Sequence, residues 1–536
     1  METTQEPQRI LLVGTERNCR SIGYVLDFKD YELIEKLTTE NYAQYQDYQI
    51  YVCELKRKSK KLLDRKLLKT VNDIQYLDDI CRKIDEEWLN AKTKSVNNLS
   101  LNADKTCAVK QQAIKEENKN TKSEKPLIKN IKRCVKYPLR IARCVISRLK
   151  KAIKKMIKSL KYFIKNKYKK DIKNYLNNLS ASGLLLYVLR APINSQIKCT
   201  IIENNVRVYR DGKIRACCST MVPFGSLLME GNANEIYNSI YARIVKLSSL
   251  NQTYCLCALN RWCHGYCETK FVQSTKDSWN TPKIPQALGL SYDATCNLVC
   301  KSCRKEFYVM DSNTQQRAIL ITEKLLNSGW CEQTKHLQIA GNGEVFYSPC
   351  YRKLIITDLS RENITILSNG ILFNESNWQL IANKYKKIDV EISVDAATAE
   401  TYRKLRGADF NILTKNLTML GELRRRKKIN FFQINFVVQR ENFVEMPDFI
   451  ELGRTLSVDK IQFQRLNSRA HINDKEFNKL CLIINNEYLD YELWKVLQNP
   501  IFNDPIVDLK GLQRYIDASE KKYRKRYESE CKSHTA

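Results

Sequence analysis

Three cysteines in one short segment form the arrangement with the clearest chemistry. Cys296, Cys300 and Cys303 follow a strand-like run that begins at Gly289, in the pattern Cys-x3-Cys-x2-Cys. Soft thiolates suit iron–sulfur clusters, and three of them in one loop can hold three irons of a four-iron, four-sulfur cluster. Because no fourth cysteine lies close by, one iron keeps an open position for a substrate or cofactor. Structural zinc is the alternative, but it normally takes four protein ligands from paired hooks.

Further segments follow this loop in order. Each contains a strand-like run, except the segment from Glu400, which is helix-like. They are Leu337-Gln-Ile-Ala-Gly341-Asn-Gly343-Glu344, Ile364-Thr-Ile-Leu-Ser368-Asn369-Gly370, Val390-Glu-Ile-Ser393-Val-Asp395, Glu400-Thr-Tyr-Arg-Lys-Leu-Arg406-Gly, Asn435-Phe-Val-Val-Gln439 and Lys460-Ile-Gln-Phe. Together with the cysteine loop, this series resembles the radical S-adenosylmethionine (radical SAM) superfamily over residues 284–470. The resemblance implies a partial (β/α)6 barrel related to the TIM barrel, with the cluster at the carboxyl ends of the strands.

The resemblance also implies a set of residues that bind S-adenosylmethionine. These residues are Gly341, Asn342, Gly343, Glu344, Ser368, Asn369, Ser393, Asp395 and Arg406. The first four read Gly-Asn-Gly-Glu where the family has Gly-Gly-Glu-Pro, and their glycines still permit close approach to the methionine amino group. Ser393 and Asp395 would contact the ribose, with Arg406 nearby. The alternative is that Ser393 and Asp395 only cap the end of a strand.

In the family, the cofactors carry the chemistry and the protein positions them. The open iron takes the amino and carboxylate groups of S-adenosylmethionine, and an electron from the cluster breaks a sulfur–carbon bond. The resulting 5′-deoxyadenosyl radical abstracts hydrogen from a substrate. The resemblance therefore implies a low-potential electron donor as well. Beyond the cluster loop, the sequence identifies no catalytic side chain.

A second group of cysteines lies before this region, within residues 190–275. Its members are Cys199, Cys217, Cys218, Cys255, Cys257, Cys263 and Cys267. The run from Val206 to Cys217 predicts a hairpin that turns at Asp211-Gly212. The group resembles a SPASM domain, an auxiliary-cluster module of peptide-modifying radical SAM enzymes. That module normally follows the barrel, whereas here it precedes it.

The SPASM pattern implies that Cys199, Cys217 and Cys267 serve one auxiliary cluster, with Cys218 as an additional candidate ligand. This assignment comes from the resemblance, since no spacing rule pairs these distant cysteines. We expect one auxiliary iron–sulfur cluster in the module. A zinc-binding knuckle made from the same cysteines is the alternative.

A second auxiliary cluster would draw on Cys255, Cys257 and Cys263. The family places two residues between the first two of these cysteines, and here only Leu256 separates them. This departure puts the second cluster in doubt.

Two α/β regions must position these groups. Residues 284–470 alternate strand-like and helix-like segments, which is typical of a parallel α/β domain. Residues 1–90 contain the apolar run Arg9-Ile-Leu-Leu-Val-Gly14 and a second one from Tyr48 to Cys53. They predict a small Rossmann-like domain, but its first turn lacks the second and third glycines of a dinucleotide fingerprint. We expect a degenerate, structural or partner-binding domain there, and a helical region over residues 471–536.

Residues 91–180 predict a polar linker and a basic helix, and much of the formal charge of +31 lies between Lys125 and Lys170. Residues 91–124 are polar and predict a linker. From Lys125 to Lys170 there is no acidic residue, and apolar residues recur at helical spacing. Such a basic amphipathic helix can lie on an anionic membrane surface. The alternative is a helix whose apolar stripe packs on the protein while its lysines face water.

The compartment follows from the cysteines and the N-terminus. The chain has 20 cysteines, but Met1 to Arg9 is polar and lacks the apolar core of a signal peptide. Disulfides are therefore disfavoured. No run approaches the roughly 18–20 apolar residues of a membrane span. We expect a cytoplasmic protein with reduced cysteines, peripheral to the membrane if the basic helix binds there.

The sequence thus predicts a radical SAM enzyme that acts on a peptide, a protein or a cell-envelope substrate. The rival hypothesis is a zinc- or cluster-containing protein that binds nucleic acid or serves as a scaffold, without catalysis. Binding to nucleic acid is disfavoured, because the basic helix has no interleaved aromatic residues before Tyr162 and Phe163. An inactive scaffold would have no reason to keep Gly341, Glu344, Ser393 and Asp395.

Overall fold

The computed structural model describes residues 9–28, 31–38, 41–45, 48–53, 74–86, 176–193, 197–218, 220–229, 231–257, 271–273, 282–304, 306–308, 310–339, 341–357, 362–467 and 473–534. The predicted linker over residues 91–124, the predicted basic helix from Lys125 to Lys170, and Cys263 and Cys267 lie outside these residues. The predictions made for those parts of the chain stay predictions.

The N-terminal region contains a small parallel sheet. Its strands are β1 (Arg9–Val13), β2 (Glu32–Ile34), β3 (Tyr48–Val52) and β4 (Ile74–Tyr76), in the order β2-β1-β3-β4. All three pairings are parallel. Leu11 and Val13 of β1 pack with Ile50 and Val52 of β3 in one apolar cluster. Helix α1 (Glu16–Val25) follows β1, and the Thr15 hydroxyl accepts from the backbone N–H of Asn18 at its start.

A larger, mostly parallel sheet dominates the rest of the described chain, which confirms the predicted α/β class. It has ten strands in the order β18-β15-β14-β13-β12-β11-β10-β6-β7-β8. Six of them run in sequence order and pair in parallel: β10 (Ala287–Ser291), β11 (His336–Ile339), β12 (Asn363–Ser368), β13 (Lys387–Ser393), β14 (Phe431–Val438) and β15 (Lys460–Arg465).

The cysteine-rich region extends this sheet beyond β10. Strand β6 (Asn205–Tyr209) pairs with β10 in parallel, and β7 (Lys213–Arg215) and β8 (Gly225–Ser226) continue antiparallel. The β6–β7 turn contains Gly212 with φ +68°, where an added Cβ would lie 2.6 Å from the Leu228 side chain. The module that precedes the large α/β region in sequence therefore shares its sheet.

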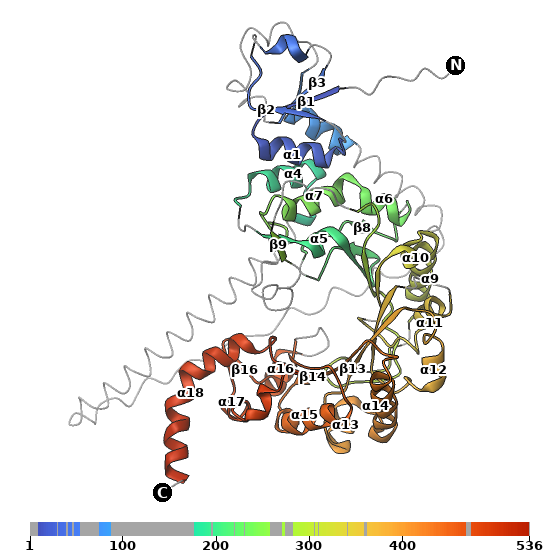
Figure 1. Ribbon diagram of the computed structural model, residues 1–536, viewed down its shortest axis with the longest axis vertical. Coiled ribbons are helices and arrows are strands. Elements are labelled where there is room, and N and C mark those ends of the chain that lie inside the picture. The colour runs from blue at the N-terminus through green and yellow to red at the C-terminus, as the bar shows by residue number, and fades with distance from the viewer. Residues whose placement is uncertain are drawn as a thin grey trace, which may run out of the picture. The chain divides into compact units, whose positions relative to one another are not determined.

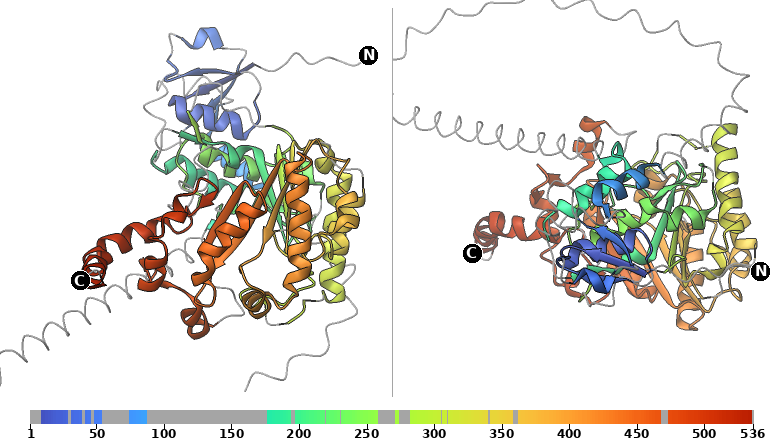
Figure 2. Two further views of the ribbon diagram at one scale, coloured as in Figure 1. Left: turned by 60° about the horizontal axis from the view of Figure 1, so that its bottom comes forward. Right: turned by 90° about the horizontal axis from the view of Figure 1, so that it is seen from above.

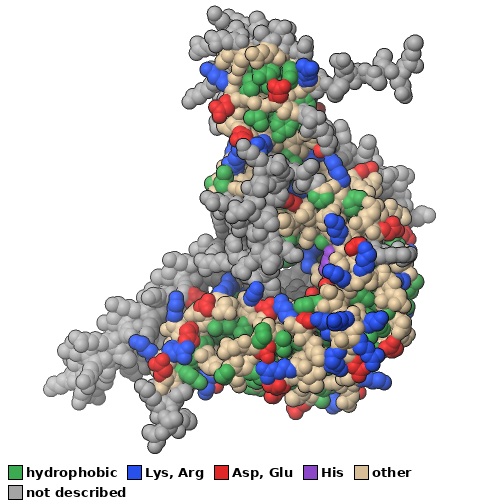
Figure 3. Space-filling view, in the orientation of Figure 1, with side chains coloured by type: hydrophobic (Ala, Val, Ile, Leu, Met, Phe, Trp, Pro, Cys, Tyr) green, Lys and Arg blue, Asp and Glu red, His purple; other side chains and the backbone are tan. Residues whose placement is uncertain are grey.

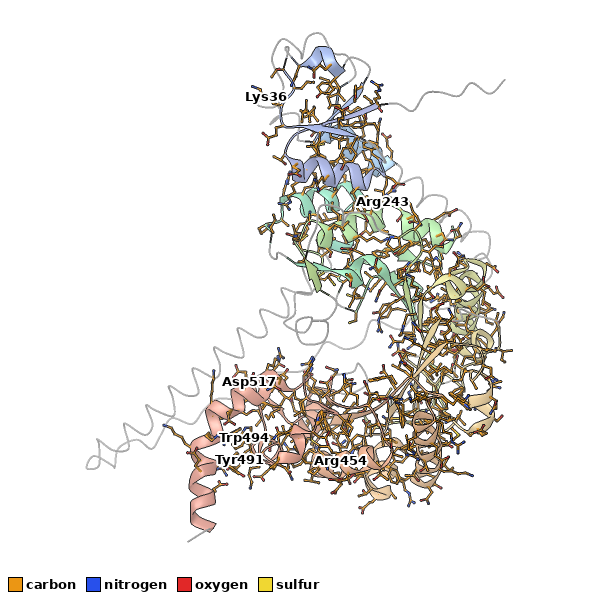
Figure 4. The ribbon with its side chains drawn as sticks, viewed as in Figure 1. Lys36, Arg243, Arg454, Tyr491, Trp494 and Asp517 are labelled. Carbon is orange, nitrogen blue, oxygen red and sulfur yellow. The ribbon has the colours of Figure 1, made fainter. Side chains whose placement is uncertain are left out.

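Helices and one short strand pair complete the cysteine-rich region. They are α4 (Ala181–Arg190), β5 (Ile197–Cys199), α5 (Thr200–Asn204), α6 (Ala233–Asn238), α7 (Ile240–Leu250) and β9 (Phe271–Gln273). Strand β5 pairs antiparallel with β9. Helix α7 packs against α1 and α4, and Arg243 of α7, labelled in Figure 4, forms an ion pair of 3.5 Å with Asp27.

Helices along the outer side of the large sheet connect its strands (Figures 1 and 2). They are α9 (Ser312–Asn327), α10 (Trp330–Gln333), α11 (Pro349–Ile356), α12 (Glu375–Gln379), α13 (Ala399–Arg406), α14 (Phe410–Arg425) and α15 (Met446–Thr455). Several of these helices begin at a residue whose side chain accepts a hydrogen bond from a backbone N–H of the first turn, such as Asp311 and Thr398. Phe449 of α15 packs on Phe436 of β14 with ring centroids 4.8 Å apart.

One face of the strands is apolar and buried, and the opposite face carries polar side chains that are half-buried or, as at Thr365, Gln433 and Asn435, buried. On β13, Ile388, Val390 and Ile392 are buried, whereas Asp389 and Glu391 are half-buried. Successive side chains of a strand point to opposite faces, so the apolar face meets the helices and the polar face is left open. This alternation decides which side of the sheet can take a polar ligand.

The C-terminal region contains short strands as well as the expected helices. Its elements are α16 (Asp474–Leu480), β16 (Ile483–Ile484), β17 (Tyr488–Leu489), α17 (Tyr491–Val496), β18 (Val507–Asp508) and α18 (Gln513–His534). Single 3-10 turns occur at Tyr42–Tyr45, Phe443–Glu445 and Pro500–Asn503. Tyr491 and Trp494 of α17, labelled in Figure 4, pack against Tyr523 of α18 with ring centroids 5.1 and 5.7 Å away.

Charges on the described surface are mixed in sign. On the face shown in Figure 3, Lys and Arg side chains lie among Asp and Glu side chains. Arg424 pairs with Asp459 at 2.6 Å, and Arg454 pairs with Asp504 at 2.7 Å. Among the described residues, no helix has both the length and the apolar character needed to cross a membrane.

Gly421→Ala tests the packing of α14 on the segment after α15. An added Cβ would lie 2.5 Å from the carbonyl oxygen of Leu456, which is backbone and cannot rotate away. Alanine improves helix propensity by about 1 kcal/mol, but overpacking costs about 1–3 kcal/mol. We expect a net loss of stability in urea unfolding. Lys415→Ala, an exposed change on the same helix, is the control. A stabilised Gly421→Ala protein would contradict this packing.

Candidate functional site

The three cysteines of the loop after β10 lie together. Cys296 and Cys300 are buried and share an apolar cluster with Leu298, and Cys303 packs against this cluster. The backbone N–H of Cys303 donates to the carbonyl of Cys300 at 2.9 Å, and that of Lys301 donates to Leu405 at the end of α13. Burial raises the pKa of the Cys296 thiol. The loop thus gathers three thiols at the carboxyl end of β10.

A buried aspartate holds the start of this loop. Asp293 is fully buried, and its carboxylate accepts from the backbone N–H of Thr295 at 2.8 Å and from the hydroxyl of Ser348. Its own backbone N–H donates to the hydroxyl oxygen of Tyr351 at 3.0 Å. Both Ser348 and Tyr351 belong to the start of α11, so the loop conformation depends on the helix that follows β11.

The Gly-Asn-Gly-Glu segment lies directly against the cysteine loop. Gly343 has φ +76°, and an added Cβ would lie 2.6 Å from the carbonyl oxygen of Asp293. The backbone N–H of Glu344 donates to the carbonyl of Thr295 at 2.9 Å. The Asn342 side chain donates to the carbonyl of Ser291 at 3.2 Å, and an added Cβ on Gly341 would collide with the Ser291 hydroxyl. Only glycine fits at position 343, because the neighbouring group is backbone.

Glu344 links this segment to the end of β12. Its side chain is fully buried and accepts from the Ser368 hydroxyl and the Asn369 backbone N–H, each at 2.7 Å. Burial raises the pKa of Glu344 to about 7, against these hydrogen bonds, which favour the ionised form. The Asn369 amide in turn donates to Asn297 at 2.9 Å and approaches the Cys296 sulfur at 3.7 Å.

Asp395 and Arg406 form a buried ion pair beside the loop. An Nη2 group of Arg406 lies 2.9 Å from the Asp395 carboxylate. Asp395 has φ +68°, and its other oxygen accepts from the backbone N–H of Val437 at 2.7 Å. Nη1 of Arg406 lies 3.4 Å from the Cys300 sulfur. Burial alone lowers the pKa of Arg406, but Asp395 and Cys300 raise it above its usual value.

The structure therefore brings most of the predicted cofactor-binding residues to one place. Contacts connect the cysteine loop, the segment from Gly341 to Glu344, the Ser368–Asn369 pair and the Asp395–Arg406 pair at the carboxyl ends of β10 to β13. Ser393 is half-buried at the end of β13, in register with Asn435. Asp395 is occupied by Arg406 and Val437, so its predicted contact with a ribose stays a prediction.

The donor set suits a four-iron cluster. In the described part of the chain, no three Cys, His, Asp or Glu side chains converge closely enough to hold one metal ion. A four-iron cluster does not need such convergence, because each thiolate binds a different iron. Three soft thiols in contact with N–H donors, in a largely buried loop, match the ligands that such clusters take.

The second group of cysteines is only partly described. Cys199 ends β5, and Cys217 and Cys218 follow β7. A β-bridge between Thr220 and Cys257 brings the Cys-x-Cys segment beside the Cys217–Cys218 turn. In the same contact, the backbone N–H of Met221 donates a hydrogen bond to the carbonyl oxygen of Leu256 at 2.9 Å. The Cys255 sulfur accepts from the Thr253 hydroxyl at 3.4 Å. Cys263 and Cys267 lie outside the described residues.

The open face of the large sheet next to this site is polar. The positions on this face include Gln338, Thr365, Glu391, Gln433, Asn435, Gln462 and Arg207. Arg207 comes from β6, and its Nη2 donates to Gln338 at 2.7 Å. Gly289 makes room for it, since an added Cβ would lie 3.1 Å from Arg207 Cγ. TIM-barrel interiors are instead filled by branched apolar residues.

Sequence reasoning missed several residues of the site. Asp293, Ser348 and Tyr351 hold the loop but belong to no recognised motif, although Ser348-Pro349 is a helix-start signal. Arg304 directly follows the last loop cysteine, and its Nη2 lies 3.7 Å from the Cys303 sulfur. A basic residue beside a predicted ligand is a signal that could have been used. Arg207 could not have been found, because only the pairing of β6 with β10 brings it here.

Replacing Glu344 with glutamine tests the buried carboxyl. Its folded pKa of about 7 lies above the usual value of about 4.3, so the folded protein binds this proton more tightly. That contribution to stability is full below about pH 4 and is lost as the pH rises through about 7. Glutamine can keep both hydrogen bonds, because the Ser368 hydroxyl can accept as well as donate.

We therefore expect Glu344→Gln to gain stability over the unaltered protein as the pH rises, by about 1–3 kcal/mol near pH 8. Urea unfolding from about pH 5 to about pH 8 measures this difference. Glu332→Gln, at an exposed position, controls for loss of a surface carboxylate. A difference that does not change with pH would show that Glu344 titrates normally.

Comparison with known proteins finds partial structural likeness alone. No family model matches the chain, and no curated protein matches it. Streptococcus suis SuiB bound to precursor peptide SuiA shares 18% identity over 34% of this chain and 40% of its own, with TM-score 0.27.

Two other solved structures are similar to a comparable extent. For anSMEcpe with bound AdoMet and Kp18Cys peptide the identity is 17%, over 41% and 62% of the two chains, with TM-score 0.29. For TYW1 with a lysine-pyruvate adduct it is 17%, over 39% and 70%, with TM-score 0.25. The chain thus spans about two fifths of the length of SuiB. These likenesses carry no argument about activity, which rests on the residues of the site.

Proposed function

We propose that this chain is a radical SAM enzyme in which Cys296, Cys300 and Cys303 hold a [4Fe-4S] cluster. The observation that carries this proposal is the position of the three-thiol loop. It follows the first of six parallel strands that run in sequence order, and it contacts both the Gly341–Glu344 segment and Asn369. Scattered core cysteines would not be accompanied by these segments in this order.

The proposal extends to the architecture. Strands β10 to β15 would form the partial (β/α)6 barrel, with the helices outside and the polar face inside. The region from Cys199 to Cys267 would be the SPASM-like module, holding one auxiliary iron–sulfur cluster. The pairing of β6 with β10 supports a role for this module beside the substrate, because it places Arg207 on the polar face.

When bound, the cluster and S-adenosylmethionine supply the 5′-deoxyadenosyl radical that abstracts hydrogen from the substrate. The protein's own residues bind, orient and exclude water. The loop presents three thiolates, and Asp293 keeps its backbone in place. Gly341, Gly343 and Glu344, with Ser368 and Asn369, form the wall against which the methionine part of the cofactor would lie.

The polar face next to the site favours a substrate rich in hydrogen-bonding groups. Half-buried amides and charges, such as Gln338, Glu391 and Arg207, are costly to desolvate unless a ligand replaces the water they lose. Arg207 and Glu391 form no salt bridge with another described residue. Burial raises the pKa of Glu391. We propose a peptide or protein substrate, since a peptide backbone supplies donors and acceptors along its whole length.

Cys300→Ala tests the cluster assignment. The protein, purified and reconstituted with iron and sulfide without air, should release 5′-deoxyadenosine from S-adenosylmethionine when a reductant is added. Cys300→Ala should lose this release and part of the iron, because the remaining loop thiolates cannot hold the cluster, while iron bound elsewhere stays.

The matched control is Cys331→Ala, which removes a buried cysteine of α10 that no cysteine motif includes. It should keep both iron and cleavage. Undiminished release by Cys300→Ala would refute the loop assignment. Zinc in place of iron in the unaltered protein would favour the rival binding protein.

Cys217→Ala tests the auxiliary site. The variant should contain less iron and yet still cleave S-adenosylmethionine in the absence of substrate, because the loop cluster is intact. Cys481→Ala, a half-buried cysteine of the C-terminal region, is the control and should keep all its iron. Full iron content in Cys217→Ala would remove this cysteine from the ligand set.

A further inference from the structure

Within the described part of the chain, each of the three loop cysteines has a side-chain N–H donor beside its sulfur. The Asn369 amide lies 3.7 Å from Cys296, Arg304 Nη2 lies 3.7 Å from Cys303, and Arg406 Nη1 lies 3.4 Å from Cys300. The donors come from three different parts of the chain: the loop after β12, the residue after the last cysteine, and the end of α13. Two of the three are guanidinium groups, which carry a permanent positive charge.

Arg406 is the strongest of these donors. It is buried, with 9% of its surface exposed, and it makes the shortest of the three contacts with sulfur. Asp395 holds the guanidinium from the other side at 2.9 Å, and Asp395 is itself fixed by the Val437 backbone N–H. The chain Val437–Asp395–Arg406–Cys300 therefore aims one N–H group at the sulfur in surroundings from which water is largely excluded.

An N–H group beside a thiolate acts on the redox equilibrium of the iron that the thiolate binds. Reduction adds one negative charge, and a hydrogen-bond donor or a nearby cation stabilises the reduced form more than the oxidised form. The effect is large where the local dielectric is low, as it is around Arg406. Donors on the cluster sulfurs therefore raise the reduction potential of a cluster.

We propose that Arg406 is a positioning residue that orients the Cys300 thiolate and raises the reduction potential of the loop cluster, with Arg304 acting in the same direction on Cys303. This inference rests on the proposed function, because it requires that the loop hold a cluster. It differs from the contact near the ribose that the family resemblance implies for Arg406, since it assigns the guanidinium to a sulfur. A higher reduction potential makes the cluster easier for an electron donor to reduce.

The test is a redox titration of the reconstituted full-length protein, followed by electron paramagnetic resonance. The signal of the loop cluster is identified as the one that Cys300→Ala loses. Arg406→Gln should lower its potential by at least a tenfold change in the reduction equilibrium, or about 59 mV for one electron. Arg406→Lys, which keeps the charge but not the fork of N–H groups, should give a smaller decrease.

Two further variants make the result decisive. Arg403→Gln removes an exposed guanidinium from the same helix and should leave the potential unchanged. Arg304→Gln should lower the potential by less than Arg406→Gln does, because the contact of Arg304 with sulfur is longer. If Arg406→Gln fails to take up iron, the potential of Arg304→Gln tests whether a guanidinium beside a loop sulfur raises the reduction potential.

The outcomes separate this inference from the proposed function. An unchanged or raised potential in a cluster-bearing Arg406→Gln protein would overturn the inference and leave the enzyme assignment standing. The same holds for Arg304→Gln if it is the variant that binds the cluster. Unaltered protein that binds no iron and releases no 5′-deoxyadenosine would instead refute the proposed function.

Discussion

The gathering of three thiols in one largely buried loop is the constraint on which the rest of the site depends. A thiolate in a place that excludes water is unfavourable unless charges or hydrogen bonds compensate it. The chain supplies this compensation from distant segments: Arg406 reaches Cys300, and Asn369 reaches Cys296. Arg406 is itself a buried charge, so it requires Asp395. Compensation of the buried Cys300 sulfur thus depends on Arg406 at the end of α13, on Asp395, and on the backbone N–H of Val437 in β14.

The conformation of this loop also accounts for two residues next to it: Asp293, which precedes the cysteines, and Gly343, which packs against the loop. Gly343 passes so close to the Asp293 carbonyl that no Cβ fits, and Asp293 is anchored by the first residues of α11. Glu344 then lies between the loop and the end of β12, where it binds Ser368 and Asn369. The segments that resemble cofactor motifs are therefore also the segments that hold the loop together. Their presence therefore has a structural reason that does not depend on the proposed cofactor site.

The large sheet separates two tasks by its alternation. Its apolar face packs on helices, as Phe436 does on Phe449, and its polar face stays open beside the cysteine loop. The cysteine-rich region extends this face through β6, which pairs with β10 and places Arg207 within hydrogen-bond distance of Gln338. A module that precedes the α/β region in sequence thereby contributes to the same surface. This arrangement supports the proposal that the module lies beside the substrate.

The sequence by itself determined the α/β class and the loop of three thiols, because periodicity and close spacing are local properties. The family resemblance added Gly341, Glu344, Ser368 and Asn369 as candidates, since each lies in a short motif that follows a strand. Only the tertiary structure decided that β6 joins β10, that Asp395 is taken up by Arg406 and Val437, and that Arg406 points at the Cys300 sulfur. These contacts join residues far apart in the chain, and no local pattern encodes which distant partners meet when the strands pair and the helices pack.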